Sequence, residues 1–258
     1  MFNIQTPSTT DVIELKEFCH YIENNVSLGC QKSLLGASLM FKKLYNNRSF
    51  LAEFIQKELK NGYKGFQDKN SYTPPSLILA RHQDFFLRAN IWLPSPVIEE
   101  GNINVYGLMH DHNFDFLTLN YHGPGYTSKM FEYDRKGVVG KVGEKIELFQ
   151  KGTLLLNEGD VFLYRKGIDI HSQCPPKEMS VTLNLMVTKE ELQLKNQYII
   201  DSETSRILQI KGSFESKKFI YDLAMELGNE DTKDLLYEIK SHTNCDDSKK
   251  YISKELGL

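Results

Sequence analysis

The spacing of apolar residues changes twice along the chain. From about residue 9 to 61 and again after residue 188, apolar residues recur at helical intervals, whereas between 76 and 188 they alternate with polar ones. The helices we predict are Thr9 or Thr10 through Ile22, Lys32 to Tyr45, Ser49 to Lys60, Ser213 to Leu227, Asp231 to Ser241 and Ser248 to Leu256. The segment 196–211 fits either a hairpin or a short helix.

The alternating region predicts about ten short strands without helices between them. We place them near residues 77–82, 85–93, 103–110, 116–122, 126–134, 145–149, 153–156, 160–164, 168–173 and 179–187. Such a series is typical of an antiparallel sandwich or barrel. We therefore expect a mainly β protein with a helical N-terminal extension at 1–75, a β-barrel at 76–188 and a mainly helical C-terminal extension at 189–258. We expect the helical ends to cover the barrel or to form the interface of a homodimer, so that the three regions pack as one globular unit.

Composition and charge narrow the function classes. The 258 residues carry 31 basic and 34 acidic side chains, a near balance that gives no field for nucleic acid. No run of 18 apolar residues occurs, so we expect no membrane span. The first residues lack the basic and apolar regions of a signal peptide, and the 4 cysteines show no metal-binding or disulfide spacing. These features favour a cytoplasmic protein.

The placement of histidines suggests chemistry. His110 and His112 are two residues apart at the end of a predicted strand, so both side chains leave the same face. Two imidazoles on one face can bind one divalent metal if another strand supplies a third ligand. Histidines two apart also occur in protein cores and on surfaces without a metal, so the pair needs further support.

That support comes from the surrounding sequence. GLMHDH at 107–112 and GDVFLYRKGIDIH at 159–171 resemble the two conserved blocks of the cupin superfamily. KGTLLLNEGDVFLY at 151–164 resembles the strand, turn and strand that lead into the second block. The resemblance covers roughly residues 76–188 and implies a cupin-like double-stranded β-helix barrel. It also implies that His110, His112 and His171 are metal ligands.

The sequence departs from the cupin pattern at three places. Phe116 or Leu117 stands where cupins usually have a glutamate ligand, Arg165 replaces the usual proline, and one extra residue separates Gly167 from His171. The implied site therefore has three histidines, as in thiol dioxygenases and related oxygenases. A site of two histidines and one carboxylate would need Asp111 or Asp115, which fits less well, and a cupin without metal stays open.

Three imidazoles do not select one metal by themselves. The resemblance favours Fe(II), with zinc, nickel, manganese or copper as alternatives. The expected function is a mononuclear oxygenase or dioxygenase that uses dioxygen on a small polar metabolite. The alternatives are a cupin-type sensor or binding module and a zinc or nickel isomerase or lyase.

Period-two counting also predicts a pocket. Polar residues share one face of three predicted strands, and in a cupin barrel that face lines the cavity, whereas in an ordinary half-buried sheet it faces water. The predicted substrate pocket consists of Asn90, Trp92, Thr118, Asn120, Thr182 and Asn184.

Two further side chains on these strands are candidates for catalysis. Arg88 is predicted to lie on the same face of its strand as the pocket residues Asn90 and Trp92. A guanidinium can bind a substrate carboxylate through two hydrogen bonds. Arg81 and Arg165 are alternatives for that role. His122 is predicted to lie on the same strand face as Asn120 and to be an acid/base group. The alternatives are a fourth metal ligand and a surface histidine.

Overall fold

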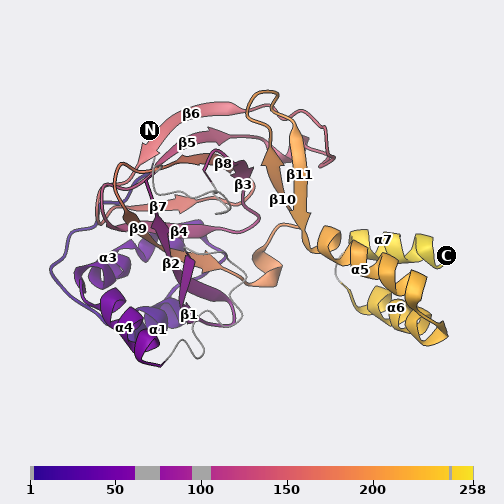
Figure 1. Ribbon diagram of the computed structural model, residues 1–258, viewed down its shortest axis with the longest axis horizontal. Helices are drawn as coiled ribbons and strands as arrows, with labels where there is room; N and C mark the ends of the chain where they lie inside the picture. The colour runs from indigo at the N-terminus through magenta and orange to yellow at the C-terminus, as the bar shows by residue number, and fades with distance from the viewer. Residues whose placement is uncertain (1–2, 62–75, 95–105, 244–245, 258) are drawn as a thin grey trace.

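The computed structural model describes residues 3–61, 76–94, 106–243 and 246–257, in two antiparallel sheets flanked by helices (Figure 1). The first sheet has the order β1 (Ser76–Arg81), β2 (Phe85–Trp92), β9 (Ser180–Val187), β4 (Phe116–His122) and β7 (Val161–Tyr164). The second has the order β11 (Ile207–Gly212), β10 (Asn196–Ile200), β3 (Met109–Asp111), β8 (Asp169–Cys174), β5 (Thr127–Glu132) and β6 (Phe149–Leu155).

Eight of these strands have the order of a jelly roll. The neighbours β2-β9-β4-β7 face β3-β8-β5-β6, and the chain crosses between the two sheets as it proceeds from β2 to β9. This two-sheet arrangement is the one on which cupins are built. The prediction of a mainly β, cupin-like double-stranded β-helix with helical extensions is confirmed, although the two sheets do not close into a continuous barrel.

The N-terminal helices cover the outer face of the first sheet (Figure 1). They are α1 (Leu15–Asn25), α2 (Gln31–Gly36), α3 (Ser38–Asn46) and α4 (Phe50–Lys60). Phe18 and Phe41 from these helices share one apolar cluster with Leu87, Leu117 and Leu185 from the sheet. Because apolar residues occupy alternate positions on β2, β4 and β9, burying this face turns the polar residues between them toward the second sheet.

The C-terminal helices pack on one another. They are α5 (Ser213–Leu227), α6 (Glu230–His242) and α7 (Asp246–Glu255), and they share a small cluster around Tyr221, Leu236 and Ile252. In Figure 1 they stand beyond the β10–β11 hairpin, away from the rest of both sheets. The open choice at 196–211 is thus settled as a hairpin. The division of the chain into the three predicted regions stays a prediction.

Several predicted boundaries differ from the observed ones. The first helix begins at Leu15, where the Glu17 side chain accepts a hydrogen bond from the backbone N–H of Glu14, the N-cap residue. The second predicted helix is interrupted at Ala37 and becomes α2 and α3. β6 contains most of the strand predicted at 153–156 but only the last residue of the one predicted at 145–149, and residues 103–105 of another predicted strand lie outside the described residues. Short 3-10 turns occupy Arg135–Gly137 and Glu190–Leu192.

No helix in the described ranges is long and apolar enough to cross a membrane.

Candidate metal centre and adjoining pocket

Three histidines meet between the sheets. His110 comes from β3 and His112 follows this strand directly, while His171 comes from β8, where it lies directly opposite His110 in the antiparallel pairing. All three side chains are buried. Each offers one ligand atom, and these atoms lie within 4.8 Å of one another. The structure thus brings together the three histidines that the sequence singled out, from segments about 60 residues apart.

The donor set fits a metal ion. The Nε2 atoms of His112 and His171 lie 2.9 Å apart. This is close to the roughly 3 Å that separates two nitrogen ligands when each lies about 2.1 Å from one ion. Burial lowers the pKa of all three histidines, well below the ordinary value for His112 and His171. The rings are therefore neutral near pH 7 and can offer lone pairs to a cation.

Neither aspartate considered as a third ligand faces this group. Asp111 is fully buried on the opposite face of β3, where its carboxylate accepts hydrogen bonds from Tyr133 Oη at 2.6 Å and Arg135 Nη1 at 2.7 Å. It also accepts one from the backbone N–H of Tyr198 at 2.6 Å. Asp115 accepts hydrogen bonds from the Gln31 side chain and the Lys166 backbone. Because both aspartates are bound elsewhere, the metal ligands that the described residues provide at this site are the three histidines.

Aromatic side chains lie at the position where cupins usually have a glutamate ligand. The Phe116 ring packs edge-on against His112 with ring centres 4.8 Å apart, and it stacks on Tyr164 with centres 4.6 Å apart. Tyr164 also contacts His171, with ring centres 4.6 Å apart. The aromatic pair therefore shields one side of the histidines from water and places no charge there.

The polar face of the first sheet is buried inside the fold. Arg88, Asn184 and Thr118 are neighbours in one row across β2, β9 and β4. The next row is formed in the same way by Asn90, Thr182 and Asn120. All of these side chains except half-buried Arg88 are buried. Within the described residues Thr118 Oγ1, Asn120 Oδ1 and Asn184 Oδ1 have no hydrogen-bond partner, so buried polar atoms are available to a ligand.

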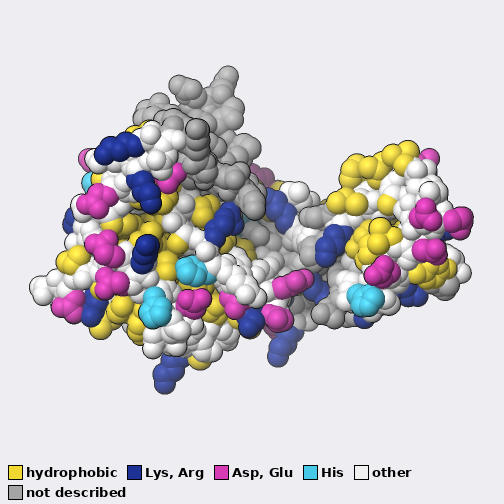
Figure 2. All heavy atoms as spheres, turned by 90° about the horizontal axis from the view of Figure 1, so that it is seen from below, with side chains coloured by type: hydrophobic (Ala, Val, Ile, Leu, Met, Phe, Trp, Pro, Cys, Tyr) yellow, Lys and Arg dark blue, Asp and Glu magenta, His cyan; other side chains and the backbone are white. Residues whose placement is uncertain are grey.

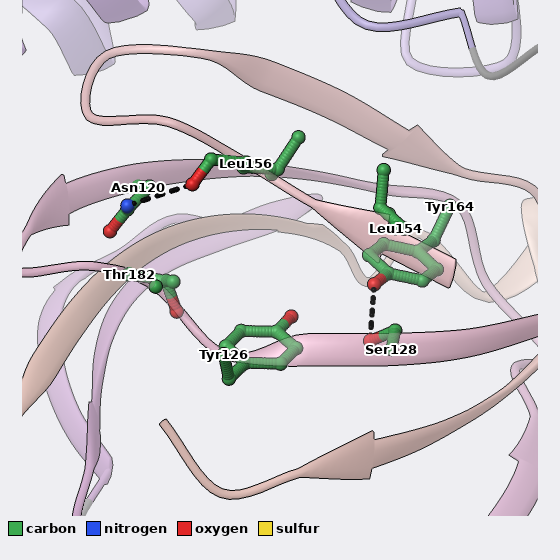
Figure 3. A pocket seen from close by; sticks show the side chains of 8 residues that line it. Asn120, Tyr126, Ser128, Leu154, Leu156, Tyr164 and Thr182 are labelled. Carbon is green, nitrogen blue, oxygen red and sulfur yellow. Dashed lines mark hydrogen bonds between the residues drawn. The ribbon is translucent and has the colours of Figure 1, made fainter. Parts of the chain in front are cut away.

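A pocket continues from this interior (Figure 3). Its lining consists of Asn120, Gly125, Tyr126, Ser128, Leu154, Leu156, Tyr164 and Thr182. At one side Trp92 donates a hydrogen bond from Nε1 to Thr182 Oγ1 at 2.9 Å and packs on Tyr126, with ring centres 4.0 Å apart. The histidines do not line this pocket, but Tyr164 contacts both it and His171.

Sequence reasoning missed the contribution of the second sheet to this pocket. Ser128 and Tyr164 face each other with their hydroxyl oxygens 3.3 Å apart, as Figure 3 shows. Gln173, two residues after His171, is buried on the same face of β8. The alternation of Ser128 and Met130 along β5, with Tyr126 directly before it, is the signal that could have indicated this inner face.

Arg88 provides positive charge inside the fold. Burial is the main cause of the lowered pKa of His110 and His112, and the charge of Arg88 adds to it. Burial likewise raises the pKa of Tyr126, and Arg88 opposes that rise.

The structure places His122, predicted to be an acid/base group, at the surface and outside the lining of the pocket. A bulge follows Asn120, because Asn120 pairs with Thr182 whereas His122 pairs with Val181. The extra residue breaks the alternation on which the prediction depended. The His122 side chain is 53% exposed and its Nδ1 lies 4.0 Å from Glu158 Oε1, which corresponds to the surface alternative.

The Arg165 side chain, an alternative candidate for binding a substrate carboxylate, binds two carboxylates of the protein itself. Its Nη2 donates to Asp169 Oδ1 at 2.6 Å and to Glu132 Oε1 at 2.7 Å. Its backbone N–H also donates to Asp169 Oδ2 at 2.7 Å. This clamp closes the turn between β7 and β8, and it explains how the chain reaches His171 without the usual proline and with one extra residue.

No family model matches the chain, and no curated protein matches it. Solved structures similar to it include hydroquinone 1,2-dioxygenase from a Sphingomonas species with 4-hydroxybenzoate bound, at 10% identity and a TM-score of 0.32, covering 46% of this chain and 69% of that one. A cupin-2 domain protein from Shewanella frigidimarina has 11% identity and a TM-score of 0.29, covering 52% and 99%. Acireductone dioxygenase from Bacillus anthracis with cadmium in its active centre has 16% identity and a TM-score of 0.28, covering 54% and 64%.

Proposed function

We propose that the chain is a mononuclear metal-dependent oxygenase of the dioxygenase type, with the metal held by His110, His112 and His171. The observation that carries the proposal is the group of three buried, neutral imidazoles beside a polar interior. When bound, the metal would bind and polarise a substrate and would bind dioxygen. Fe(II) is the metal we favour, and zinc, nickel and manganese are the alternatives.

The surrounding residues support a small polar substrate that carries a carboxylate. Arg88 would bind the carboxylate, because a guanidinium offers two parallel donors. Thr118 and Asn184 in the same row, and Asn90, Asn120 and Thr182 in the next, would hold the other polar groups of the substrate. Trp92 would close the far end, and Phe116 would exclude water from the side of His112.

A cupin-type binding module is the second candidate. It is favoured by the C-terminal helices, which stand away from the sheets and expose the apolar side chains of Phe219 and Leu227. A zinc or nickel isomerase or lyase would share the ligand set and differ in its metal.

The first experiment is metal analysis of untagged protein purified without a chelator. We expect near-stoichiometric iron in the wild type, and loss of it in His110→Ala and His171→Ala. His122→Ala is the matched control, because this histidine lies outside the site, and it should keep the metal. Iron-loaded protein should then consume dioxygen in the presence of small carboxylates.

Each of the other outcomes changes the proposal in a defined way. Zinc or nickel bound by the same residues, without oxygen uptake, would replace the oxygenase with isomerase or lyase chemistry. Absence of metal from the wild type after incubation with Fe(II), Zn(II), Ni(II) or Mn(II) would leave the binding module.

A further inference from the structure

Helix α5 carries an exposed apolar stripe that consists of Phe219, Ile220, Leu223 and Leu227. These side chains are 71%, 61%, 46% and 75% exposed, respectively. No other helix or strand in the described ranges exposes more than two large hydrophobic side chains. Isolated apolar side chains are normal on a protein surface, but a contiguous group of them marks a site of interaction.

The stripe lies on the side of α5 that faces away from the other C-terminal helices. Its members recur at intervals of four and seven residues, so they fall within about 100° of the helix circumference. Tyr221 and Met225 lie on the other side, where they pack with α6 and α7. Asp222 accepts a hydrogen bond from the Tyr251 hydroxyl of α7, so its charge is directed away from the stripe.

The area of the stripe matches what pairing with a second copy of the chain needs. A fully exposed side chain of this size presents about 200 Å², so the stripe leaves about 500 Å² of mostly apolar surface in water. Two such stripes placed face to face would bury about 1,000 Å² before the polar rim is counted, which is the size at which specific interfaces begin. A two-fold axis brings the same surface of both copies together, so one self-complementary stripe is sufficient.

The charges at the two ends of the stripe favour an antiparallel arrangement. Lys217 and Lys218 directly precede it, whereas Glu226 and the first turn of α6, with Glu230 and Asp231, carry negative charge at its other end. When two copies of α5 run antiparallel, the basic end of each lies beside the acidic end of the other. A parallel arrangement would place like charges together.

We propose that the apolar stripe of α5 is a homodimer interface, in which two copies of the helix pack antiparallel across a two-fold axis. Leu223, in the middle of the stripe, lies nearest the axis, and Phe219 of one protomer packs on Leu227 of the partner subunit. Side chains four residues apart form a ridge that fits between the ridges of a facing helix. The inference is independent of the proposed function, because no residue of α5–α7 belongs to the three-histidine group or to the lining of the pocket.

Sedimentation velocity of the full-length protein between about 1 and 100 µM tests the proposal. Phe219→Glu and Leu227→Glu place a charge in the interface. Leu59→Glu is the matched control, because this leucine is 50% exposed on α4, a helix remote from α5. Lys217→Glu, Glu226→Lys and the double variant test the antiparallel arrangement, and circular dichroism checks that every variant is folded.

We expect a wild-type dimer with a dissociation constant in the micromolar range. Phe219→Glu and Leu227→Glu should raise this constant at least about tenfold, whereas Leu59→Glu should leave it unchanged. Lys217→Glu and Glu226→Lys should each raise it about two- to fivefold at low salt. The double variant should restore the wild-type value, since these two residues are too far apart on one helix to interact.

Three results would overturn the inference. A wild type that stays monomeric throughout this range would leave the stripe to a different kind of partner. A dimer that survives both substitutions in the stripe would have its interface elsewhere. A double charge reversal without recovery would exclude the antiparallel arrangement.

Discussion

Single positions decide what the metal centre can bind. Phe116 occupies the place of a charged ligand, and its ring contacts His112, so the site has neutral donors only. Arg165 replaces a proline, and its hydrogen bonds to Asp169 hold the turn that leads to His171. Both departures from the cupin pattern are thus compensated locally, one by aromatic packing and the other by an ion pair.

The buried histidines predict a pH dependence of stability. A histidine whose pKa is lowered by folding stays neutral while the unfolded chain takes up a proton, so stability is lost as pH falls below about 6.5. Each such histidine contributes a slope of up to about 1.4 kcal/mol per pH unit. Urea unfolding of metal-free protein between pH 7.5 and 5 should show this slope, and His171→Ala should reduce it. Exposed His122→Ala should keep the wild-type slope, and equal slopes in all three proteins would contradict the account.

At the scale of elements, the short strand β3 must be held on both faces. Its inner face carries His110, His112 follows its last residue, and its outer face carries Asp111, which bonds to Tyr133 and Arg135. The strand has only 3 residues, so its own ladder gives few hydrogen bonds. The buried carboxylate on its outer face therefore fixes the position of the two neighbouring ligands.

Removing that carboxylate should destabilise the protein strongly. Asp111→Ala leaves Tyr133 and Arg135 without their acceptor, and breaking a buried pair costs about 3 kcal/mol when one partner, here Arg135, is partly exposed. Asp84→Ala is the control, because its contact with Lys189 is half-exposed and should cost less than about 1 kcal/mol. Urea unfolding measures both changes, and similar values for the two variants would show that the Asp111 cluster does not hold β3.

The size of the buried apolar core differs between the parts of the molecule. The sheets and N-terminal helices share an extensive apolar cluster, whereas the C-terminal helices bury Tyr221, Leu236 and Ile252. Phe219 and Leu227 on α5 remain 71% and 75% exposed. Hydrophobic side chains are accordingly visible on the surface of the C-terminal helices in Figure 2. Segments with few buried apolar contacts open more readily than the rest of a fold.

We therefore expect α5–α7 to open before the sheets. Hydrogen exchange followed by mass spectrometry should give amides of these helices at least about tenfold less protection than those of β4 and β9. Ile252→Ala should reduce protection in α5–α7 only, whereas Leu117→Ala, in the large cluster, should reduce it throughout the sheets. Uniform protection along the wild-type chain would contradict this expectation.

Local patterns in the amino-acid sequence were enough to predict the periodicity of the elements and the residue types of the candidate ligands. The sequence predicted strand 116–122 and helix Ser213–Leu227 with their observed bounds, because alternation and helical spacing are local properties. It also put His110 and His112 on one face. Local pattern, however, does not say which face of a sheet will be buried, or where one extra residue will break the alternation.

Tertiary structure decided the rest. Packing of α1–α4 on the apolar face of the first sheet turned the polar rows inward, and the pairing of β3 with β8 brought His171 opposite His110. The bulge in β4 sent His122 to the surface, and the facing sheet added Ser128 and Gln173. These outcomes depend on contacts between segments far apart in the chain, where a shift of one residue exchanges the two faces of a strand.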